Sequence, residues 1–307
     1  MSKHDIHLKK GEILKNQYQI VKEIGAGGMS IVYLAVEIDK QTLVAIKVAD
    51  MTRKISRRLF SEAKILSELD HPALPQIVDF FSSEDNRYFY LVQEYINGQP
   101  LQECFEQQES IMNQEEVIQI GITISEVLHY LHTRKPNPII YRDLKPANIM
   151  ITNEGAIKLI DFGIARKYVH NQLKDTVQIG TVGFAAPEQF EKRQSDARTD
   201  LFSLGALMYY LLTGGRYVYI SQKPVGELRK GLTKSLKQCI KLLVKTNPDD
   251  RVQSADKTRE LLIKAKEEIK RATTIFVGTE WMAVKYIVAI SFFLGVVLYI
   301  ISDQINR

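Results

Sequence analysis

Short apolar runs, several of them alternating with polar positions, occur throughout the first third of the chain. They occupy residues 18–24, 31–35, 43–48, 74–81 and 88–95. Alternation with a period of two is typical of a β-strand with one buried face. Glycines interrupt the chain after the first run, and a polar segment separates the last two. The pattern therefore predicts a β-rich N-terminal unit that ends near residue 95.

Apolar positions three and four residues apart predict helices elsewhere. One such set indicates a helix over residues 57–69: Leu59, Ala63, Leu66 and Leu69. A long helix is predicted over residues 113–131, where Asn113 and Glu116 form a capping pattern. The segment 200–212 is apolar on nearly every side, as in a helix buried within a domain. The chain after residue 95 is therefore predicted to be largely helical.

One further apolar segment, residues 282–302, is long enough to cross a membrane. Its only charge is Lys285, and a helix of this length spans roughly 30 Å, the thickness of a bilayer's hydrocarbon core. A buried core helix is the alternative, but only residues 303–307 follow to cover it. More basic residues precede the segment or lie at its start than follow it. We therefore expect a single pass through the cell membrane, with the preceding residues in the cytoplasm.

Composition and charge narrow the classes of protein that remain. The chain has 307 residues, of which 45% are hydrophobic, as expected for a folded core. The net charge is only +5, but residues 223–271 contain fourteen Lys or Arg and seven Asp or Glu. Cys104 and Cys239 are far apart and lack metal-binding spacing, which suits a reducing compartment. The N-terminus has no apolar run, so no signal peptide is predicted.

Polar residues cluster in the centre of the chain. Asp143, Lys145 and Asn148 lie within six residues, and Asp161 follows eighteen residues after Asp143. Apolar runs on either side of a four-residue turn predict a β-hairpin between Asn148 and Asp161. Their oxygens could then share a divalent cation such as Mg²⁺. Asp143 would accept a hydroxyl proton, and Lys145 would lie near a phosphoryl group during transfer.

A glycine-rich stretch and an isolated lysine precede this region. Residues 25–30 lie between two predicted strands, and their glycines would let backbone amides approach phosphates closely. An ordinary hairpin turn is the alternative. Lys47 lies in the apolar strand 43–48, where a lysine is costly unless it is paired. Glu62 adjoins the apolar face of the predicted helix 57–69, and a solvent-exposed surface residue is the alternative for it.

These motifs resemble those of protein kinases, and in particular the bacterial serine/threonine kinases of eukaryotic (Hanks) type. The catalytic-loop pattern of the family resembles residues 141–148, with Tyr141 in place of the usual histidine. Its metal-binding motif resembles Asp161-Phe162-Gly163. The resemblance covers about residues 18–265. It implies an α+β, bilobal protein-kinase-like fold with a C-terminal transmembrane helix.

The resemblance also divides the chain into segments. A β-rich N-lobe is expected over residues 18–95 and a helical C-lobe over residues 98–265, with the hinge between them. The other expected segments are a polar N-terminus (1–17), a basic juxtamembrane segment (266–281), the transmembrane helix (282–302) and a short outer tail (303–307).

By the same resemblance, ATP is the phosphate donor and Mg²⁺ or Mn²⁺ is the cation. Asp143 would be the catalytic base, and Lys145 would neutralise charge on the γ-phosphoryl group. Lys47, paired with Glu62, would place the phosphates, while Asn148 and Asp161 would hold the metal. The implied nucleotide contacts are Ile24, Gly25, Ala26, Gly27, Gly28, Met29, Ser30, Ile31, Val32, Ala45, Lys47, Glu94 and Ile96.

Residues 164–185 are polar and irregular, and they resemble a kinase activation segment. Arg142 directly precedes the expected base, an arrangement that pairs with a phosphate on this segment. Thr176 is the candidate for that phosphorylation, and a plain loop threonine is the alternative. Thr181 would hydrogen-bond the residues of the catalytic loop and is a further regulatory candidate.

Two structural roles are implied in the C-lobe. Asp200 would accept backbone amides of the catalytic loop, and Arg251 would form an ion pair with Glu188. The interval 214–251 is short for the family, in the region that usually holds a substrate-docking helix.

The expected function is therefore a membrane-anchored serine/threonine protein kinase, activated by autophosphorylation of its activation segment. The expected partners are protein substrates, membrane lipid and a second copy of the chain. Nucleic acid is not an expected partner, because no recognition motif accompanies the basic region. Two alternatives remain: a pseudokinase that acts as a scaffold, and a kinase regulated by nucleic acid.

Overall fold

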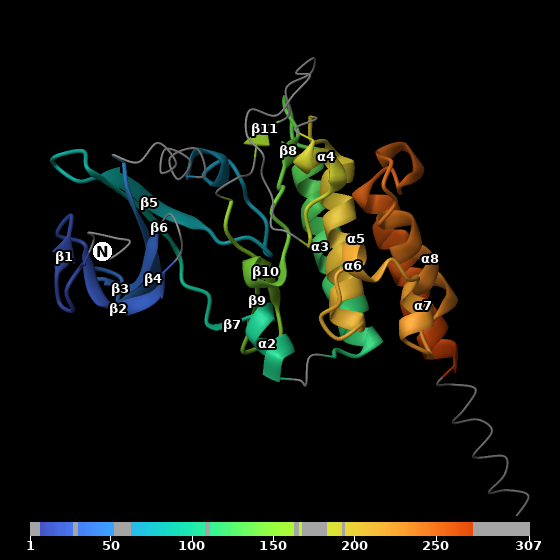
Figure 1. Cartoon of the computed structure of the whole chain (residues 1–307). Coiled ribbons are helices and arrows are strands. Elements are labelled where there is room, and N and C mark those ends of the chain that lie inside the picture. The colour runs from blue at the N-terminus through green and yellow to red at the C-terminus, as the bar shows by residue number, and fades with distance from the viewer. Residues whose placement is uncertain are drawn as a thin grey trace, which may run out of the picture.

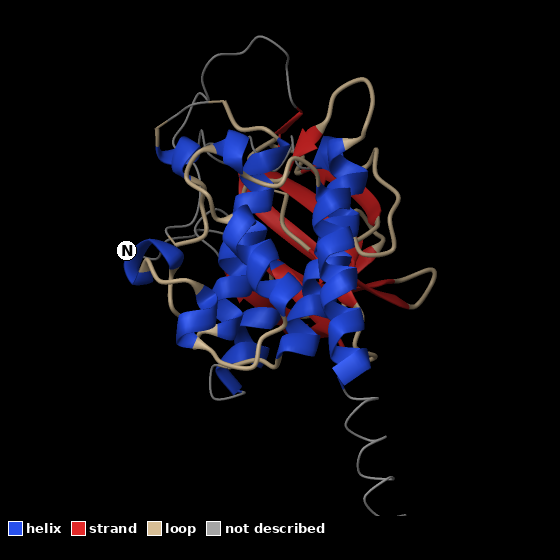
Figure 2. Ribbon diagram, turned by 90° about the vertical axis from the view of Figure 1, so that its right-hand side faces the viewer, coloured by secondary structure: helices blue, strands red, loops and turns tan. Residues whose placement is uncertain are grey.

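The computed structural model describes residues 7–26, 30–51, 63–107, 111–162, 166–167, 183–191 and 194–272. A β-sheet lobe and a helical lobe lie on opposite sides of the molecule, with short strands between them (Figure 1). From the side, the helices stand in front of the strands (Figure 2). The expected division into a β-rich N-lobe and a helical C-lobe is confirmed. The predicted transmembrane segment 282–302 lies outside these ranges, and within them no helix is long and apolar enough to cross a bilayer.

The N-lobe is one antiparallel sheet with the strand order β1-β2-β3-β4-β6-β5. The strands are β1 (Ile13–Leu14), β2 (Tyr18–Ala26), β3 (Ile31–Glu37), β4 (Thr42–Asp50), β5 (Ile77–Ser82) and β6 (Tyr88–Glu94). All five predicted strands are present. The segment predicted to start at residue 74 becomes strand only at Ile77. The Leu74 amide donates instead to the His71 carbonyl at 2.9 Å, and Pro75 has no amide hydrogen to pair.

Alternate residues of these strands build the N-lobe core. Ile20, Tyr33, Ile46 and Val92 are each at most 2% exposed and belong to one cluster. The side chains at the next position along each strand point to the opposite face. On β4 that opposite face carries Ala45 and Lys47, which line a cavity. The alternation of the sequence therefore assigns one face of the sheet to the core and the other to the site.

Only residues 63–69 of the predicted helix 57–69 are described, and residues 63–66 are helical. Ala63 and Leu66 are at most 2% exposed and join the large core, as their spacing predicts.

The C-lobe is built around α5 (Ala197–Leu212), which packs between α3 (Gln114–His132) and α8 (Lys234–Leu243). Asn113 caps α3 with the predicted capping box: its side chain accepts from the Glu116 amide at 2.9 Å. The helix α5 begins three residues before the predicted start, because Asp196 caps it by accepting from the Arg198 amide at 2.8 Å. Its residues from Thr199 onward are buried, as the uniformly apolar pattern predicts.

Four shorter helices and one long helix complete the lobe: α2 (Leu101–Gln107), α4 (Pro187–Phe190), α6 (Val218–Ser221), α7 (Val225–Leu228) and a helix over residues 255–272. The 3-10 turn η1 (Pro146–Asn148) directly precedes Ile149, and η2 (Pro248–Asp250) lies between α8 and the helix 255–272. The short interval 214–251 thus holds two four-residue helices before α8.

The predicted central hairpin is present as β9 (Ile149–Thr152) and β10 (Ile157–Leu159). Its turn places Gly155 at a φ of +82°, a conformation that glycine adopts without strain. β7 (Gly98–Pro100) extends this small sheet on the β9 side. The residues 164–185, predicted as a loop, include the short strand β11 (Arg166–Lys167), which pairs with β8 (Ile139–Ile140).

Candidate active site

A cavity of about 410 Å³ lies between the N-lobe sheet and the central hairpin. Val32 and Ala45 line it from β3 and β4, and Met150 lines it from β9. Lys47 provides a cation on its sheet side, and Asp161 provides a carboxylate on its hairpin side. Apolar walls with a few charged groups are typical of a small-molecule site. This site suits a ligand with a flat apolar part and a charged part.

The connection between the lobes forms one wall of the cavity. Glu94, at the end of β6, pairs its carboxylate with Lys158 Nζ at 2.5 Å and also accepts from the Gln76 amide. The side chain of Glu94 is therefore oriented by contacts within the protein. Ile96 also lines this wall.

Lys47 forms an ion pair with Asp161, at 3.0 Å between Nζ and Oδ1. The lysine side chain is 13% exposed, so the carboxylate provides the partner that a lysine on an apolar strand requires. The expected partner, Glu62, lies outside the described residues. Asp161 has a φ of +64°, and the next residue, Phe162, is buried edge-on against Tyr141 with ring centroids 5.1 Å apart.

Asp143 lies at the centre of a compact polar cluster. Lys145 Nζ contacts its carboxylate at 2.8 Å, and Asn148 Nδ2 donates both to that carboxylate at 3.0 Å and to the Asp143 carbonyl at 2.8 Å. Asn148 in turn accepts from the Ile160 amide at 2.8 Å through its backbone carbonyl. This chain of bonds connects the Asp143 cluster to the residue that precedes Asp161.

The catalytic loop is attached to the helical core by Asp200, which is fully buried on α5. Its carboxylate accepts from the Tyr141 amide at 2.9 Å and from the Arg142 amide at 2.7 Å, as predicted. His132 Nε2 makes a third contact at 2.8 Å, which the sequence did not suggest. Arg142 is only 3% exposed and has a φ of +74°. Such a backbone is strained for a non-glycine residue, and the two bonds to Asp200 help to hold it.

Tyr141 replaces the usual histidine and has its own anchoring role. Its hydroxyl donates to the Ile160 carbonyl, next to Asp161. The ring is fully buried. Tyr141 therefore connects the loop that carries Asp143 to the segment after β10 that carries Asp161.

A buried ion pair supports the site from behind. Both nitrogens of the Arg251 fork contact Glu188, at 2.7 and 2.8 Å, as the sequence predicts. Thr199 also donates to Glu188 at 2.9 Å. Arg251 further donates to three backbone carbonyls, those of Lys245, Thr246 and Arg198. All of these contacts to Glu188 and Arg251 come from residues of the C-lobe.

The helix α4 that carries Glu188 also contacts the catalytic loop. Gln189 Nε2 donates to the Arg142 carbonyl at 3.0 Å. Nearby, the Tyr219 hydroxyl donates to the Ala185 carbonyl at 2.6 Å. Burial raises the pKa of Tyr219, and the Glu188 carboxylate adds to the rise, so the phenol stays protonated as a donor.

The structure places most of the predicted nucleotide contacts in the cavity: Ile24, Gly25, Val32, Ala45, Lys47, Glu94 and Ile96. Ile31 is 2% exposed and packs in the N-lobe core, because it alternates with Val32 along β3. Ser30 is 8% exposed and Ala26 is exposed, and neither lines the cavity. Gly27, Gly28, Met29, Thr176 and Thr181 lie outside the described residues.

Some lining residues were missed by the sequence motifs: Tyr95, Gly98, Pro100, Glu103, Met150 and Ile160. The structure explains why residue 98 is a glycine. A Cβ there would lie 2.1 Å from the Ile151 carbonyl oxygen. No other residue fits between β7 and β9 at this point.

The residues present fit ATP and a divalent cation. The cavity has apolar walls for a base and a lysine at the end where phosphates would lie. The donor set of Asp161 carboxylate and Asn148 amide offers hard oxygen ligands, which suit Mg²⁺ or Mn²⁺. A larger cavity, of about 700 Å³, lies in the C-lobe and contains none of these groups.

The chain matches the family model for the protein kinase domain over residues 18–281. It is 33% identical over 276 residues to the serine/threonine-protein kinase PknB of Mycolicibacterium smegmatis, covering 83% of this chain and 44% of that protein. It is 35% identical over 269 residues to a probable serine/threonine-protein kinase of Streptomyces coelicolor, covering 80% of this chain and 39% of that protein. A probable serine/threonine-protein kinase of Clostridium perfringens is 29% identical over 288 residues, covering 88% and 41%.

The chain thus spans about two fifths of the length of these relatives. The family match covers the cavity, the Asp143 cluster and the Glu188–Arg251 pair together. On this match, the chain belongs to the protein kinase family.

Proposed function

We propose that the chain is an ATP-dependent serine/threonine protein kinase that transfers the γ-phosphate of ATP to hydroxyl groups of proteins. The observation that carries the proposal is the bonded connection from Asp143 through Asn148 and Ile160 to Asp161 and Lys47. It joins a carboxylate suited to accept a proton with the charged end of the cavity. The names of the related kinases support the same reaction.

The proposed roles follow from the contacts. Asp143 orients the substrate hydroxyl and accepts its proton, and Lys145, 2.8 Å away, contributes positive charge near the transferred group. Lys47 would bind the non-transferred phosphates. Asn148 and Asp161 would hold a Mg²⁺ or Mn²⁺ ion, which would neutralise charge on the phosphates. Most of the rate enhancement then comes from positioning and fixed charge.

Ala45→Leu is expected to weaken ATP binding at least tenfold, or about 1.4 kcal/mol. Ala45 lines the cavity from β4, and the larger side chain fills space that the base would occupy. The measurement is the Kd of a fluorescent ATP analogue. Leu43→Ala is the matched control, because Leu43 is on the same strand, is 49% exposed and does not line the cavity. Equal ATP affinity in Ala45→Leu and the parent chain would place the nucleotide elsewhere.

Two alternatives give different results in simple assays. A pseudokinase would bind its partners without phosphate transfer, and substitution of Asp143 would change nothing measurable. A kinase regulated by nucleic acid would show a rate that changes on addition of DNA or RNA, in a salt-dependent way. The intact Lys47, Asp143, Asn148 and Asp161 favour the enzyme over both.

We also propose that the kinase is activated by phosphorylation of Thr176, read by Arg142. Arg142 is anchored by Asp200 and lies directly before the base, so a phosphate bound to it would order the loop next to the site. Mass spectrometry of the active chain should find phosphate on Thr176, and on Thr181 if that residue is also modified. The Asp143→Asn chain, incubated without active chain, should lack phosphate at Thr176. Fully active protein with an unmodified Thr176 would contradict the proposal.

We propose that a second copy of the chain catalyses this activation, with ATP as the phosphate donor. If so, the active chain should phosphorylate added Asp143→Asn chain, at a rate that rises with the concentration of both. Phosphorylation that stays independent of concentration would indicate transfer within one chain.

Finally, we propose that residues 282–302 anchor the kinase to the cell membrane, with its catalytic lobes in the cytoplasm. The apolar length and the preceding basic residues support this. The chain should stay with the membrane fraction after washes with high salt and alkaline carbonate. A chain lacking residues 282–307 should move to the soluble fraction. Release of the full chain by salt alone would instead indicate electrostatic attachment.

A further inference from the structure

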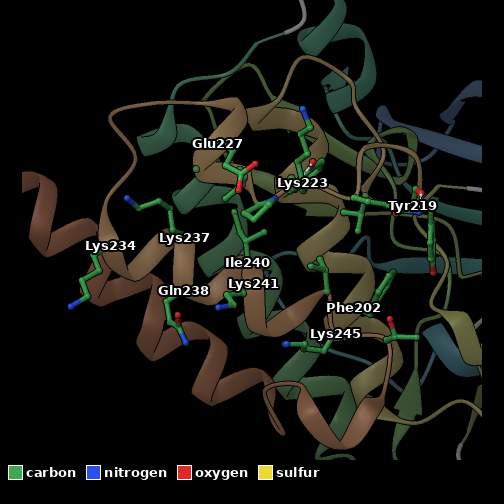
Figure 3. Close-up of a pocket in the computed structure, with 18 residues that line it drawn as sticks. Phe202, Tyr219, Lys223, Glu227, Lys234, Lys237, Gln238, Ile240, Lys241 and Lys245 are labelled. Atoms are coloured by element: carbon green, nitrogen blue, oxygen red, sulfur yellow. Dashed lines mark hydrogen bonds between the residues drawn. The ribbon is translucent and has the colours of Figure 1, made fainter.

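The cavity of about 700 Å³ in the C-lobe is a groove lined by lysines. Lys234, Lys237, Lys241 and Lys245 line it from α8 and the residues just after that helix, and Lys223 lines it from the connection between α6 and α7 (Figure 3). All five are exposed. Glu227 is the one acidic residue among the lining residues that the structure describes. We call this surface the lysine groove.

The positive charge of the lysine groove is not balanced internally. Within the described parts of the chain, none of the five lysines forms an ion pair with a carboxylate. Other exposed lysines of the chain do, as Lys257 does with Glu260 at 2.5 Å. The surface therefore carries a net charge of about +4, five lysines against one glutamate.

The positions of the lysines on α8 also destabilise the helix. Lys237 and Lys241 are four residues apart, which puts like charges side by side on the helix. Lys234 is the first residue of α8, where the helix dipole disfavours a cation. A solvated helix face would be more stable with mixed charges. A bound anionic partner would relieve this repulsion.

Hydrogen bonds and close packing hold the walls of the groove in place. The Tyr209 hydroxyl donates to the Lys223 carbonyl at 2.9 Å, which fixes the upper edge. The carbonyls of Lys245 and Thr246 accept from Arg251, which fixes the lower end. The Lys237 stem packs closely on Gly226, where an added Cβ would lie 2.8 Å from its Cδ. The groove is thus preformed, which lowers the entropic cost of binding.

The floor of the groove is aromatic and apolar. Phe202 and Tyr219 lie at one end with ring centroids 5.6 Å apart, and Ile240 lies at the centre (Figure 3). Tyr219 also donates to the Ala185 carbonyl, next to the helix α4 that contacts the catalytic loop. A ligand in the groove would therefore lie beside the segment that leads to the active site.

We propose that the lysine groove binds an acidic, extended segment of a protein substrate, away from the residue that is phosphorylated. Lys237 and Lys241 are about 6 Å apart along the helix axis. Same-side residues of an extended peptide repeat every 6.6 to 6.8 Å or so. Acidic residues at alternate positions would therefore each meet one lysine, while an apolar residue further along the segment could reach the aromatic end of the groove.

A membrane surface fits this groove less well than a peptide does. Lipid headgroups form a broad layer that would meet the exposed ends of the lysines but not the aromatic floor below them. The concave shape, with charge at the rim and rings at the base, suits a chain that enters the groove. The proposal rests on the proposed kinase function only in naming the bound protein as a substrate; the binding itself is independent of catalysis.

The first test measures binding alone, in the absence of ATP. The probe is a fluorescein-labelled peptide of about eight residues in which glutamate alternates with phenylalanine or alanine, added to the full-length chain in neutral detergent. Lys237→Glu/Lys241→Glu should weaken its binding at least tenfold, which corresponds to about 1.4 kcal/mol. Lys9→Glu/Lys10→Glu, on exposed lysines of the N-lobe side, changes the net charge equally and should leave the Kd within about twofold.

A second probe with glutamine in place of glutamate should bind poorly to every variant. Equal losses of affinity in the groove variant and the N-lobe control variant would overturn the proposal, because the effect would be one of net charge. So would unchanged peptide binding in the groove variant. A groove variant that keeps peptide binding but loses affinity for vesicles of phosphatidylserine and phosphatidylcholine would assign the surface to lipid instead.

A kinetic readout separates this proposal from the kinase function. A substrate peptide with an acidic tail should show a raised KM and an unchanged kcat in Lys237→Glu/Lys241→Glu. The same peptide without the tail should be phosphorylated equally by the variant and the parent chain. If no chain transfers phosphate, the kinase function fails while the binding result still stands. A lowered kcat on both peptides would show damage to the fold and contradict a docking role.

Discussion

Asp143→Asn is expected to lower kcat for protein phosphorylation by about 10²–10⁴-fold, the usual contribution of a positioned general base. The amide cannot accept the hydroxyl proton, yet it has the same shape and retains a carbonyl oxygen for Lys145. The Kd of ATP should change little, because Asp143 does not line the cavity. Steady-state phosphorylation and nucleotide titration of the same protein sample measure both quantities.

The matched control for this variant is Asp39→Asn, an aspartate that is exposed in the N-lobe. It removes one charge as well, but it should keep the parental kcat. If Asp143→Asn retains the parental rate, Asp143 is not the base. If it loses ATP binding in parallel with activity, the substitution has disturbed the site as a whole and the assigned role is wrong.

Glu188→Gln should lower the free energy of unfolding by about 3 to 5 kcal/mol, the usual cost of leaving one member of a buried ion pair alone. The Arg251 side chain is fully buried and contacts Glu188 through both arms of its fork. The neutral amide cannot balance that charge. For a domain of this size the thermal midpoint should fall on the order of 10 °C. Denaturant unfolding and calorimetry give the two values.

Two controls show whether the loss comes from the buried charge. Asp256→Ala breaks an exposed ion pair with Arg259 and should leave the midpoint nearly unchanged. Glu188→Met/Arg251→Met removes both charges and should recover part of the lost stability, although three backbone carbonyls then lose their donor. If Glu188→Gln alone changes the free energy of unfolding only slightly, the Arg251 charge must be stabilised by water or by a local rearrangement, which contradicts the prediction.

Much of the fold could be predicted from the sequence because its elements follow local periodicity. The alternation over β2, β3 and β4 assigns one face to the core, and the Asn113 capping box starts α3. The catalytic-loop and hairpin residues also follow from spacing, since a hairpin brings its two ends together whatever surrounds it. Boundaries moved by up to three residues where Pro75 and the Asp196 cap decided the local bonding.

The contacts that could not be predicted join residues far apart in the chain. His132 reaches Asp200 across 68 positions, and Gln189 reaches the Arg142 carbonyl across 47. Such bonds depend on how helices pack, which no local pattern encodes. The lysine groove is similar: the sequence shows a basic region, but only the packing of α8 and α6 against α5 brings its lysines beside the rings of Phe202 and Tyr219.

The central claim is that this chain transfers phosphate, and the source of the transferred group tests it most directly. The full-length chain should be incubated with a serine- and threonine-containing protein and Mg²⁺, using ATP labelled either at the γ- or at the α-phosphate. We predict label on serine or threonine from γ-labelled ATP alone, and none with Asp143→Asn. Nucleotide binding with no label transferred from either ATP, with Mg²⁺ or Mn²⁺, would contradict the account and identify a pseudokinase.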